Sequence, residues 1–241
     1  MGLSGVVAMA TAVASAVVCA APVRAGTGEA DKPNLVLFAG TDMWRDGAFL
    51  HGGLLWSPAG LDADGFTFKV ILGGGGYTYP SSSLQADVGG MLSSAAALPG
   101  WHFTRSHVTV SLYAGPLLQD YRLTPDDPGS RLRGLYAGAQ VAADVWYQPS
   151  ARTMTALSGS IASIGWSGSV RVAFGFRVLE PLFAGPETEG IWCTDYEQVR
   201  FGAHVTGVSV DALQWSVAGG LAADSYRRTG PYVRLEFSAR Y

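Results

Sequence analysis

The stretch LYAGAQVAADVWY, residues 135–147, decides the fold class of this chain. Its odd-numbered positions carry only Leu, Ala, Val and a final Tyr. The other face carries polar, small and aromatic residues: Tyr136, Gly138, Gln140, Asp144 and Trp146. Successive residues of a strand point to opposite faces of a sheet, whereas a helix repeats every 3.6 residues. The stretch therefore predicts a long β-strand.

The same alternation recurs along the rest of the chain. Arg and Lys occur on one face among Gly, Thr and Ser, and the other face is an uninterrupted series of Val, Phe, Leu and Ala. The runs with this pattern are 66–72, 170–178, 199–206, 213–221 and 232–241. A soluble sandwich also alternates, but a polar lumen and a continuous lipid-facing band are features of a membrane barrel. The sequence therefore predicts an all-β, antiparallel outer-membrane-type β-barrel of about twelve strands, with both termini in the periplasm.

The composition also favours a membrane barrel. Charged residues make up 15 % of the 241 residues, whereas soluble domains average about 25 %. The chain has 32 Gly and 11 % aromatic residues, and no long apolar run follows the N-terminus, which suits membrane strands better than membrane helices. The net charge of −3 argues against a nucleic-acid partner, because no basic patch is available to neutralise phosphates. A soluble lipocalin-like barrel or a β-sandwich is the alternative fold.

The N-terminal residues have the pattern of an export signal. The segment 6–21 is apolar and uncharged but shorter than a membrane span. We predict a signal peptide at 1–25, a short periplasmic segment at 26–33 and the β-barrel domain at 34–241. The predicted location is the outer membrane, with the periplasm as the alternative. After cleavage Cys193 is the single cysteine, so no intramolecular disulfide is expected.

Turn residues separate the predicted strands and are expected to alternate between the two ends of the barrel. The turns predicted to face outward are 46–47, 77–83, 124–131, 164–167, 190–195 and 224–230. The turns predicted to face the periplasm are 58–65, 104–107, 149–153, 180–181 and 207–211. None of the outward turns is long, so we expect no large external domain.

Aromatic residues form two further patterns. Gly recurs close to an aromatic ring in FAG at 38–40 and 183–185 and in YAG at 113–115 and 136–138. We interpret these as rings that lie over bare backbone at sheet bends. The tryptophans mostly lie near predicted strand ends: Trp44, Trp56, Trp101, Trp146, Trp166, Trp192 and Trp215. We interpret them as the interfacial girdle of a membrane barrel rather than as sugar-stacking platforms.

Several segments resemble the cellulose biosynthesis protein BcsS family. In order along the chain they are DMWRDGAFLHGGLLWSPAGLDADGF (42–66), YTYP (77–80), ALPGW (97–101), PDDPGSRLRG (125–134), GPE (185–187) and RFGAHVTG (200–207). The similarity runs from about Leu35 to the carboxy-terminus. The resemblance implies a secreted envelope protein associated with the production of cellulose or another exopolysaccharide. It implies no catalytic residues.

The first candidate site lies in the predicted lumen. With a hairpin centred near residues 193–194, Glu187 is expected opposite Arg200, with His204 two pairs further from the turn. One interpretation is a polar site for a saccharide, or a gate in a channel. The favoured interpretation is a salt bridge that keeps a narrow lumen filled and electrically balanced. The same polar face carries further cations, namely Lys69, Arg171, Arg177 and Arg234, so we expect a lumen largely plugged by side chains.

The second candidate site is an acidic pair on the outward rim. Asp126 and Asp127 lie between Pro125 and Pro128. One interpretation is a cation or sugar-hydroxyl site; the favoured one is a Pro-framed turn in which Asp caps backbone amides. One acidic pair falls well short of the six to eight oxygen ligands that calcium prefers. We therefore predict no metal site.

The chain carries no recognisable catalytic motif. It has no Gly-x-Ser-x-Gly elbow, and His102 and His107 are too loosely spaced in a turn for a metal site without further ligands. We predict that the protein is not an enzyme and needs no cofactor.

These expectations combine into one functional hypothesis. The protein is expected to be a non-catalytic outer-membrane barrel that assists cellulose or exopolysaccharide biosynthesis as a scaffold, an anchor or a narrow conduit. Its expected partners are outer-membrane lipids, cellulose or another glucan, and cellulose synthase components, with no nucleic acid. The alternatives are a lipid-modifying barrel enzyme and a soluble periplasmic glucan-binding barrel.

Overall fold

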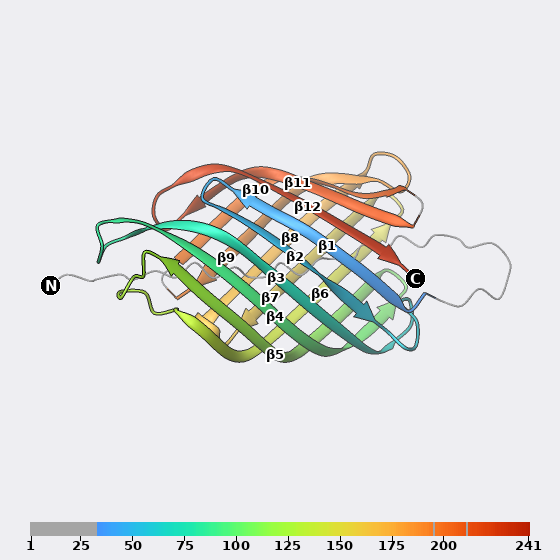
Figure 1. The fold of residues 1–241 in the computed structure, drawn as a ribbon. Helices are drawn as coiled ribbons and strands as arrows, with labels where there is room; N and C mark the ends of the chain where they lie inside the picture. The colour runs from blue at the N-terminus through green and yellow to red at the C-terminus, as the bar shows by residue number, and fades with distance from the viewer. Residues whose placement is uncertain (1–32, 195, 211) are drawn as a thin grey trace.

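The computed structural model describes residues 33–194, 196–210 and 212–241. These residues form a closed antiparallel barrel in which each strand pairs with its neighbours in sequence and β1 pairs with β12 (Figure 1). The strands are β1 (Leu35–Trp44), β2 (Gly47–Trp56), β3 (Gly65–Ser81), β4 (Ala86–Arg105), β5 (Val108–Thr124), β6 (Gly134–Ser150), β7 (Thr153–Ala162), β8 (Ser167–Arg177), β9 (Phe183–Cys193), β10 (Tyr196–Val210), β11 (Leu213–Asp224) and β12 (Thr229–Arg240). The predicted fold class and strand number are confirmed.

The described chain begins and ends at the same end of the barrel. The amide of Asn34 donates a hydrogen bond to the carbonyl of Tyr241 over 2.8 Å. We call this the terminal end and the opposite one the distal end. All the predicted turns fall at strand junctions, although β3, β9 and β10 extend into the predicted turns 77–83, 190–195 and 207–211. The predicted signal peptide at 1–25, and all but the last residue of the segment 26–33, lie outside the described residues.

The outer face of the barrel is apolar. Leu50, Leu135, Phe201 and Leu221 are each between 68 and 73 % exposed, although burial of a Leu or Phe side chain is worth roughly 1.5–3 kcal/mol. Exposed aromatic rings gather towards the terminal end: Trp56, Phe66, Trp101, Phe103, Tyr147, Phe174, Phe176, Phe237 and Tyr241. A continuous apolar band with an aromatic border is the surface that a barrel presents to lipid. Among the described residues, no helix is long and apolar enough to cross a membrane.

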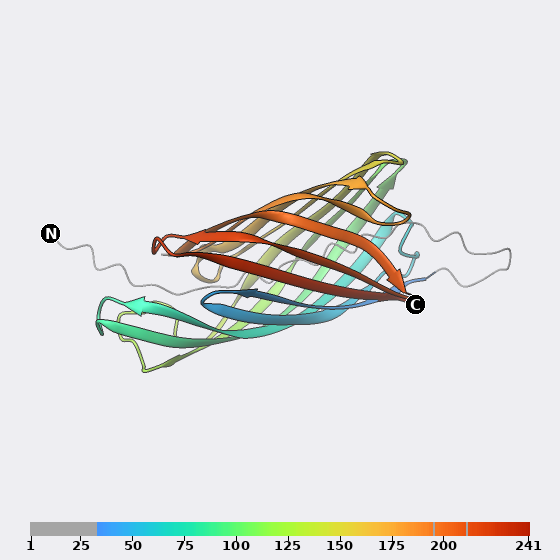
Figure 2. The same ribbon diagram turned by 90° about the horizontal axis from the view of Figure 1, so that it is seen from above.

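The strands differ in length around the barrel. Strands β3 to β6 have 17 to 20 residues, whereas β7, β8 and β9 have 10 or 11. A tilted membrane strand needs about 9–11 residues. The β3–β4 hairpin therefore projects beyond the β1–β2 turn at the distal end (Figure 2).

Glycines make room for the rings that occupy the interior. Gly75 lies directly opposite Phe49, and Gly90 directly opposite Tyr77. A Cβ atom on Gly90 would lie 2.2 Å from the Tyr77 ring, closer than atoms can approach. Large rings thus lie over bare backbone inside a narrow barrel. The glycines of the FAG and YAG segments do not serve this purpose for Phe, Tyr or Trp rings: a Cβ atom would first meet His51 at Gly40, Ala97 backbone at Gly115, Ile164 at Gly138 and Phe174 backbone at Gly185.

The girdle interpretation is wrong for two of the seven tryptophans. Trp44 is buried inside the barrel, with the Arg228 guanidinium 5.4 Å from its ring. Trp146 shares the interior face of β6 with Asp144 and packs edge-on against Phe183, with the ring centroids 6.3 Å apart. Both residues lie near strand ends, as predicted. However, they occupy positions of the strand whose side chains point inward, and this position determines which way a ring points.

Candidate functional site

The three candidate lumen residues all point into the barrel. Glu187 on β9 and Arg200 and His204 on β10 are each at most 4 % exposed. The predicted register is wrong, however, because Glu189 and not Glu187 lies opposite Arg200, and Gly202 lies opposite Glu187. Cys193 pairs with Tyr196, so the hairpin is centred one residue later than expected. A displacement of the hairpin centre by one residue moves each cross-strand partner by two residues. The same side chains of β9 and β10 therefore still point into the barrel.

Arg234 on β12 is the centre of a buried ion-pair network. Its Nε atom lies 3.2 Å from Oδ2 of Asp42 on β1, and its Nη1 atom lies 3.5 Å from Oε1 of Glu187. Its Nη2 atom also contacts a carboxylate oxygen of Glu189. The Arg234 side chain is only 1 % exposed. One guanidinium thus joins three carboxylates, one on β1 and two on β9. These two strands lie on opposite sides of the β1–β12 junction that closes the barrel.

Arg200 and Arg171 extend the network around the barrel. Arg200 Nη1 lies 2.6 Å from Asp42 Oδ2 and 3.2 Å from Glu189 Oε2. Arg171 on β8 donates to Glu187 Oε2 from two nitrogens, at 2.6 and 3.0 Å. We define the charge lattice as these groups together with Glu236: Asp42, Arg171, Glu187, Glu189, Arg200, Arg234 and Glu236. Glu187 and Arg200 are connected through Arg234 and not by a bond of their own.

The charge lattice nearly neutralises itself. It contains three guanidinium groups and four carboxylates. Tyr232 donates a further hydrogen bond to Glu187 over 2.9 Å, and Gln198 accepts one from Arg200 over 2.7 Å. A charge taken out of water costs several kcal/mol unless it is paired and hydrogen-bonded. The lattice therefore fills one side of the interior with side chains that are costly to displace.

His204 lies beside the lattice, next to a small cavity. The cavity has a volume of about 20 Å³, and Arg171, Glu236 and Ser216 also line it. An ordered water needs roughly 10–15 Å³, so this space suits a water molecule rather than a sugar. Of the three lumen candidates, Glu187 and Arg200 thus belong to the charge lattice, and His204 lies beside it.

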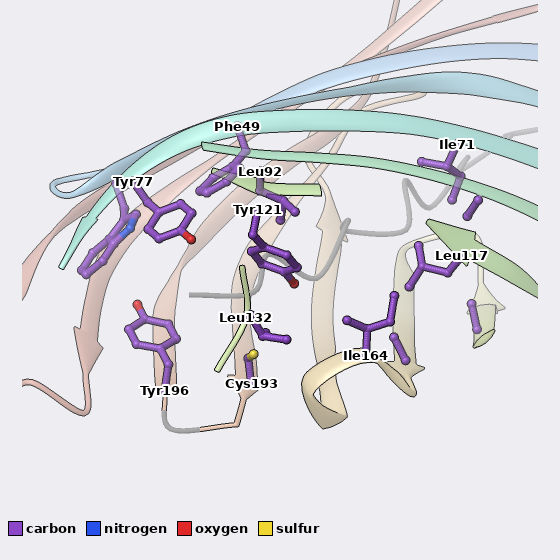
Figure 3. Close-up of a cluster of buried hydrophobic side chains, with 14 of the residues drawn as sticks. Phe49, Ile71, Tyr77, Leu92, Leu117, Tyr121, Leu132, Ile164, Cys193 and Tyr196 are labelled. Atoms are coloured by element: carbon purple, nitrogen blue, oxygen red, sulfur yellow. The ribbon is translucent and has the colours of Figure 1, made fainter. Parts of the chain in front are cut away.

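The distal end is closed by apolar and aromatic side chains. We define the distal plug as Phe49, Tyr77, Leu92, Tyr121, Leu132, Ile164, Cys193 and Tyr196, all at most 8 % exposed. Figure 3 shows Tyr77, Tyr121 and Tyr196 reaching into the barrel from β3, β5 and β10. Leu132 comes from the β5–β6 loop, so that loop folds into the mouth instead of standing above it.

The rim candidates Asp126 and Asp127 play different parts in that loop. Asp127 is 2 % exposed. It accepts hydrogen bonds from the Tyr79 hydroxyl and the Gly129 amide, both at 3.0 Å, and from the Ser83 hydroxyl. Burial raises the pKa of Asp127, but these hydrogen bonds, led by that from Ser83, outweigh it and hold the pKa below 3.8. Asp127 therefore ties the loop to the β3–β4 hairpin.

Asp126 points to solvent. Its side chain is 74 % exposed, and its carboxylate lies 3.3 Å from Arg133 Nη1. The two carboxylates of the pair are thus used separately. No group of three or more His, Cys, Asp or Glu side chains suited to a metal ion occurs in the described part of the chain.

A second buried ion pair lies on the opposite side of the barrel, towards the terminal end. Lys69 Nζ on β3 is 3.0 Å from Asp144 Oδ2 on β6. Beside this pair is a cavity of about 110 Å³, the terminal pocket, which is also lined by His102, Ser111 and Trp146. The Nδ1 atom of His102 lies 2.8 Å from Oγ of Ser111, and its Nε2 atom lies 3.1 Å from Oγ1 of Thr104.

Residues 36–241 match the family described as "Cellulose biosynthesis protein BcsS". The chain belongs to the BcsS family. The match spans almost all of the described BcsS-family barrel, and the resemblance seen in the sequence is confirmed. A comparison of the sequence with curated proteins finds no match.

Solved structures similar to this BcsS-family barrel are outer-membrane barrels. The deltaS2S3 mutant of the monoaromatic hydrocarbon channel TodX has a TM-score of 0.50 and 9 % identity, covering 88 % of this chain and 91 % of that chain. The β domain of the Bordetella autotransporter BrkA has a TM-score of 0.50 and 11 % identity, covering 88 % and 100 %. The KdgM porin has a TM-score of 0.46 and 10 % identity, covering 86 % and 99 %. At these identities the likeness shows the fold alone.

Sequence reasoning missed several members of the BcsS-family charge lattice. Asp42, Glu189 and Glu236 were not singled out, although each occupies an inward position of the alternation. Asp144 was placed on the inward face but not paired with Lys69, because their strands are three apart around the barrel. The sequence signal that could have found these residues is the presence of charges of opposite sign at inward positions. Which of these charges meet across the interior depends on the curvature of the barrel.

Proposed function

We propose that this protein is a non-catalytic outer-membrane barrel that supports cellulose or other exopolysaccharide biosynthesis as an anchor or scaffold, and not as the conduit for the glucan. The family membership supplies the biosynthetic context. The apolar outer band and the likeness to outer-membrane barrels support the location. In this location the terminal end faces the periplasm and the distal end faces outward.

The filled interior is the observation that carries the proposal against a conduit. The charge lattice occupies one side of the interior, and the distal plug closes the outward mouth. Passage of a glucan chain would require both to move, and removing one partner from a buried ion pair costs about 3–5 kcal/mol. A barrel built in this way is stable in the membrane while leaving its periplasmic and outward edges available to partners.

A deletion in a cellulose-producing host tests the biosynthetic role. The quantity to measure is cellulase-released glucose, determined separately outside the cells and within the envelope. Accumulation in the envelope with little glucose outside supports an anchoring or export role. Unchanged amounts in both fractions would remove the cellulose assignment. The purified protein in planar bilayers tests the closed interior, since a steady ion conductance would contradict it.

The rival function is a barrel hydrolase that modifies lipids. The observation that favours it is the Ser111–His102 contact, because a serine within hydrogen-bond distance of a histidine is the beginning of a nucleophilic site. Against it, the second nitrogen of His102 faces the Thr104 hydroxyl and not a carboxylate. Loss of a lipid change in a Ser111→Ala strain, with normal barrel abundance, would establish the rival.

A further inference from the structure

The terminal pocket is open at one end and closed at the other. At its rim, the Asp62 side chain is 73 % exposed and lies 3.7 Å from Arg240 Nη1. At its floor, the Lys69 side chain is 2 % exposed and lies 4.9 Å from the centre of the Tyr113 ring. The pocket therefore receives a ligand from the terminal end and offers no passage beyond the Lys69–Asp144 pair.

The polar groups of the pocket suit a ligand with several hydroxyl groups. Asp144 Oδ1 is buried, and it receives no hydrogen bond from the part of the chain that the structure describes. Ser111 and Thr104 each lie within hydrogen-bond distance of His102, and a hydroxyl can donate one bond while accepting others. A buried acceptor without a donor is costly, so a ligand hydroxyl that reaches Asp144 Oδ1 would gain a favourable hydrogen bond.

The paired charges of the pocket favour a neutral ligand over an anionic or cationic one. Its lining contains two cations, Lys69 and Arg240, and two carboxylates, Asp62 and Asp144, so its formal charge is zero. Each cation lies within 3.7 Å of one of the carboxylates. A phosphate or an ammonium group would have to displace a partner from one of these pairs, whereas a neutral ligand leaves both intact.

The apolar part of the lining completes the site. Trp146, Tyr113 and Phe38 contribute ring surface to the same cavity. A sugar ring presents C–H groups on its faces and hydroxyl groups at its edge, so it matches a wall of aromatic rings beside hydroxyl, imidazole and carboxylate groups. A cavity for one water needs roughly 10–15 Å³, so about 110 Å³ has room for several waters or for part of one sugar ring.

We propose that the terminal pocket binds part of the terminal sugar ring of a neutral glucan chain, from the periplasmic side. The sugar class is argued from the lining, whereas the choice of a glucan rests on the proposed function. The barrel would then hold a glucan end at the inner surface of the outer membrane without transporting it.

Calorimetric titration of the purified full chain tests this proposal. The titrants are cellotetraose and, separately, inorganic phosphate, in a detergent without a sugar headgroup that would itself occupy the pocket. We expect saturable binding of cellotetraose and none of phosphate. Absence of cellotetraose binding, or binding of phosphate in its place, would overturn the proposal.

Variants locate the binding. Asp144→Asn is the direct change, but it leaves Lys69 without its counter-charge and endangers folding. Ser111→Ala keeps that pair and should weaken cellotetraose binding about fivefold, the value of one hydrogen bond. The matched control is Ser216→Ala, which also loses an interior hydrogen bond, to Glu236 at 3.0 Å, away from the pocket. Equal affinities in the Ser111→Ala and Ser216→Ala proteins would show that the sugar binds elsewhere and would overturn the proposal.

The two proposals fail in different ways. Titration of the pure protein does not depend on any role in cells, and the deletion experiment does not depend on the pocket. A clear deletion phenotype without cellotetraose binding overturns only the pocket. Binding without a deletion phenotype overturns only the biosynthetic role.

Discussion

Asp42 on the first strand and Arg234 on the last strand lie directly opposite each other across the seam that closes the barrel, with Oδ2 and Nε 3.2 Å apart. The backbone ladder between β1 and β12 would close the barrel with any pair of residues at these positions. The ion pair adds a contact that only this register provides, because a shift of either strand by one residue turns the charged side chain of that strand outward.

Replacement of Arg234 should be strongly destabilising. Arg234→Met leaves Asp42, Glu187 and Glu189 with one cation fewer in a buried site, and we expect a loss of about 3–5 kcal/mol. The measurement is the free energy of unfolding in urea. The control is Arg122→Met, at a side chain that is 79 % exposed and paired with Asp120 on the surface, where we expect a change within about 0.5 kcal/mol. Equal effects of the two changes would mean that the lattice does not stabilise the fold.

Two adjacent glycines on β4 should respond oppositely to alanine. A methyl group on Gly90 meets the Tyr77 ring at 2.2 Å, so Gly90→Ala forces that ring out of the distal plug. Overpacking of this kind costs about 1–3 kcal/mol. Gly89 faces outward, and its nearest neighbour would be the Thr124 carbonyl oxygen at 3.5 Å, so Gly89→Ala should be neutral or slightly stabilising. Unfolding free energies of the two variants give the comparison, and equal values would contradict the ring-over-glycine packing.

The β5–β6 loop should loosen in acid through Asp127. Because its folded-state pKa lies below 3.8, its stabilisation is complete above that ordinary value and is lost as the pH falls through the folded-state pKa. Asp127→Asn should cost about 1–3 kcal/mol at pH 7 by weakening buried hydrogen bonds. The difference between wild type and variant should shrink in strong acid. Thermal unfolding at neutral and acidic pH measures it, with Asp126→Asn as an exposed control that should change little; a constant difference at all pH values would exclude this role.

A charge on the outer face separates a membrane barrel from a soluble one. Val172 lies at the middle of β8 and points outward, and Val178 lies just beyond the end of that strand. In a membrane, Val172→Arg should cost about 2–4 kcal/mol and Val178→Arg at most about 1 kcal/mol. The readout is folding into lipid vesicles followed by unfolding in urea. In a soluble barrel both changes are harmless, so equal stability of the two variants would argue against membrane insertion.

The alternation of side chains predicted the fold because it depends on parity alone. Inward and outward positions on β6 and β8 follow directly from the period of two, and glycine and proline mark the turns. Strand length was harder to predict. The segment with Tyr77 and Tyr79 follows a glycine run and was predicted as a turn, but β3 continues through it. Tyr77 belongs to the distal plug, and Tyr79 donates a hydrogen bond to Asp127.

The candidate site was predicted only in part. Glu187, Arg200 and His204 were correctly placed inward, but Glu187 and Arg200 have partners on β1, β8 and β12 as well as across their own hairpin. Such contacts depend on how tightly the sheet curls, and a linear pattern carries no information on curvature. The one-residue error at the Cys193 turn shows the same limit, since turn centres are set by local geometry that composition does not specify.

The sequence separations within the charge lattice imply an order of assembly. Arg171 and Glu187 are 16 residues apart on neighbouring strands and can pair as soon as their hairpin forms. Arg234 and Glu189 are 45 residues apart and meet only when the sheet has curled. Arg234 and Asp42 are 192 residues apart and meet only when the two ends of the chain join. Each step places a charge that the next step neutralises, so a half-curled sheet contains charges that have no partner yet. Closure of the barrel between β1 and β12 supplies the last partners.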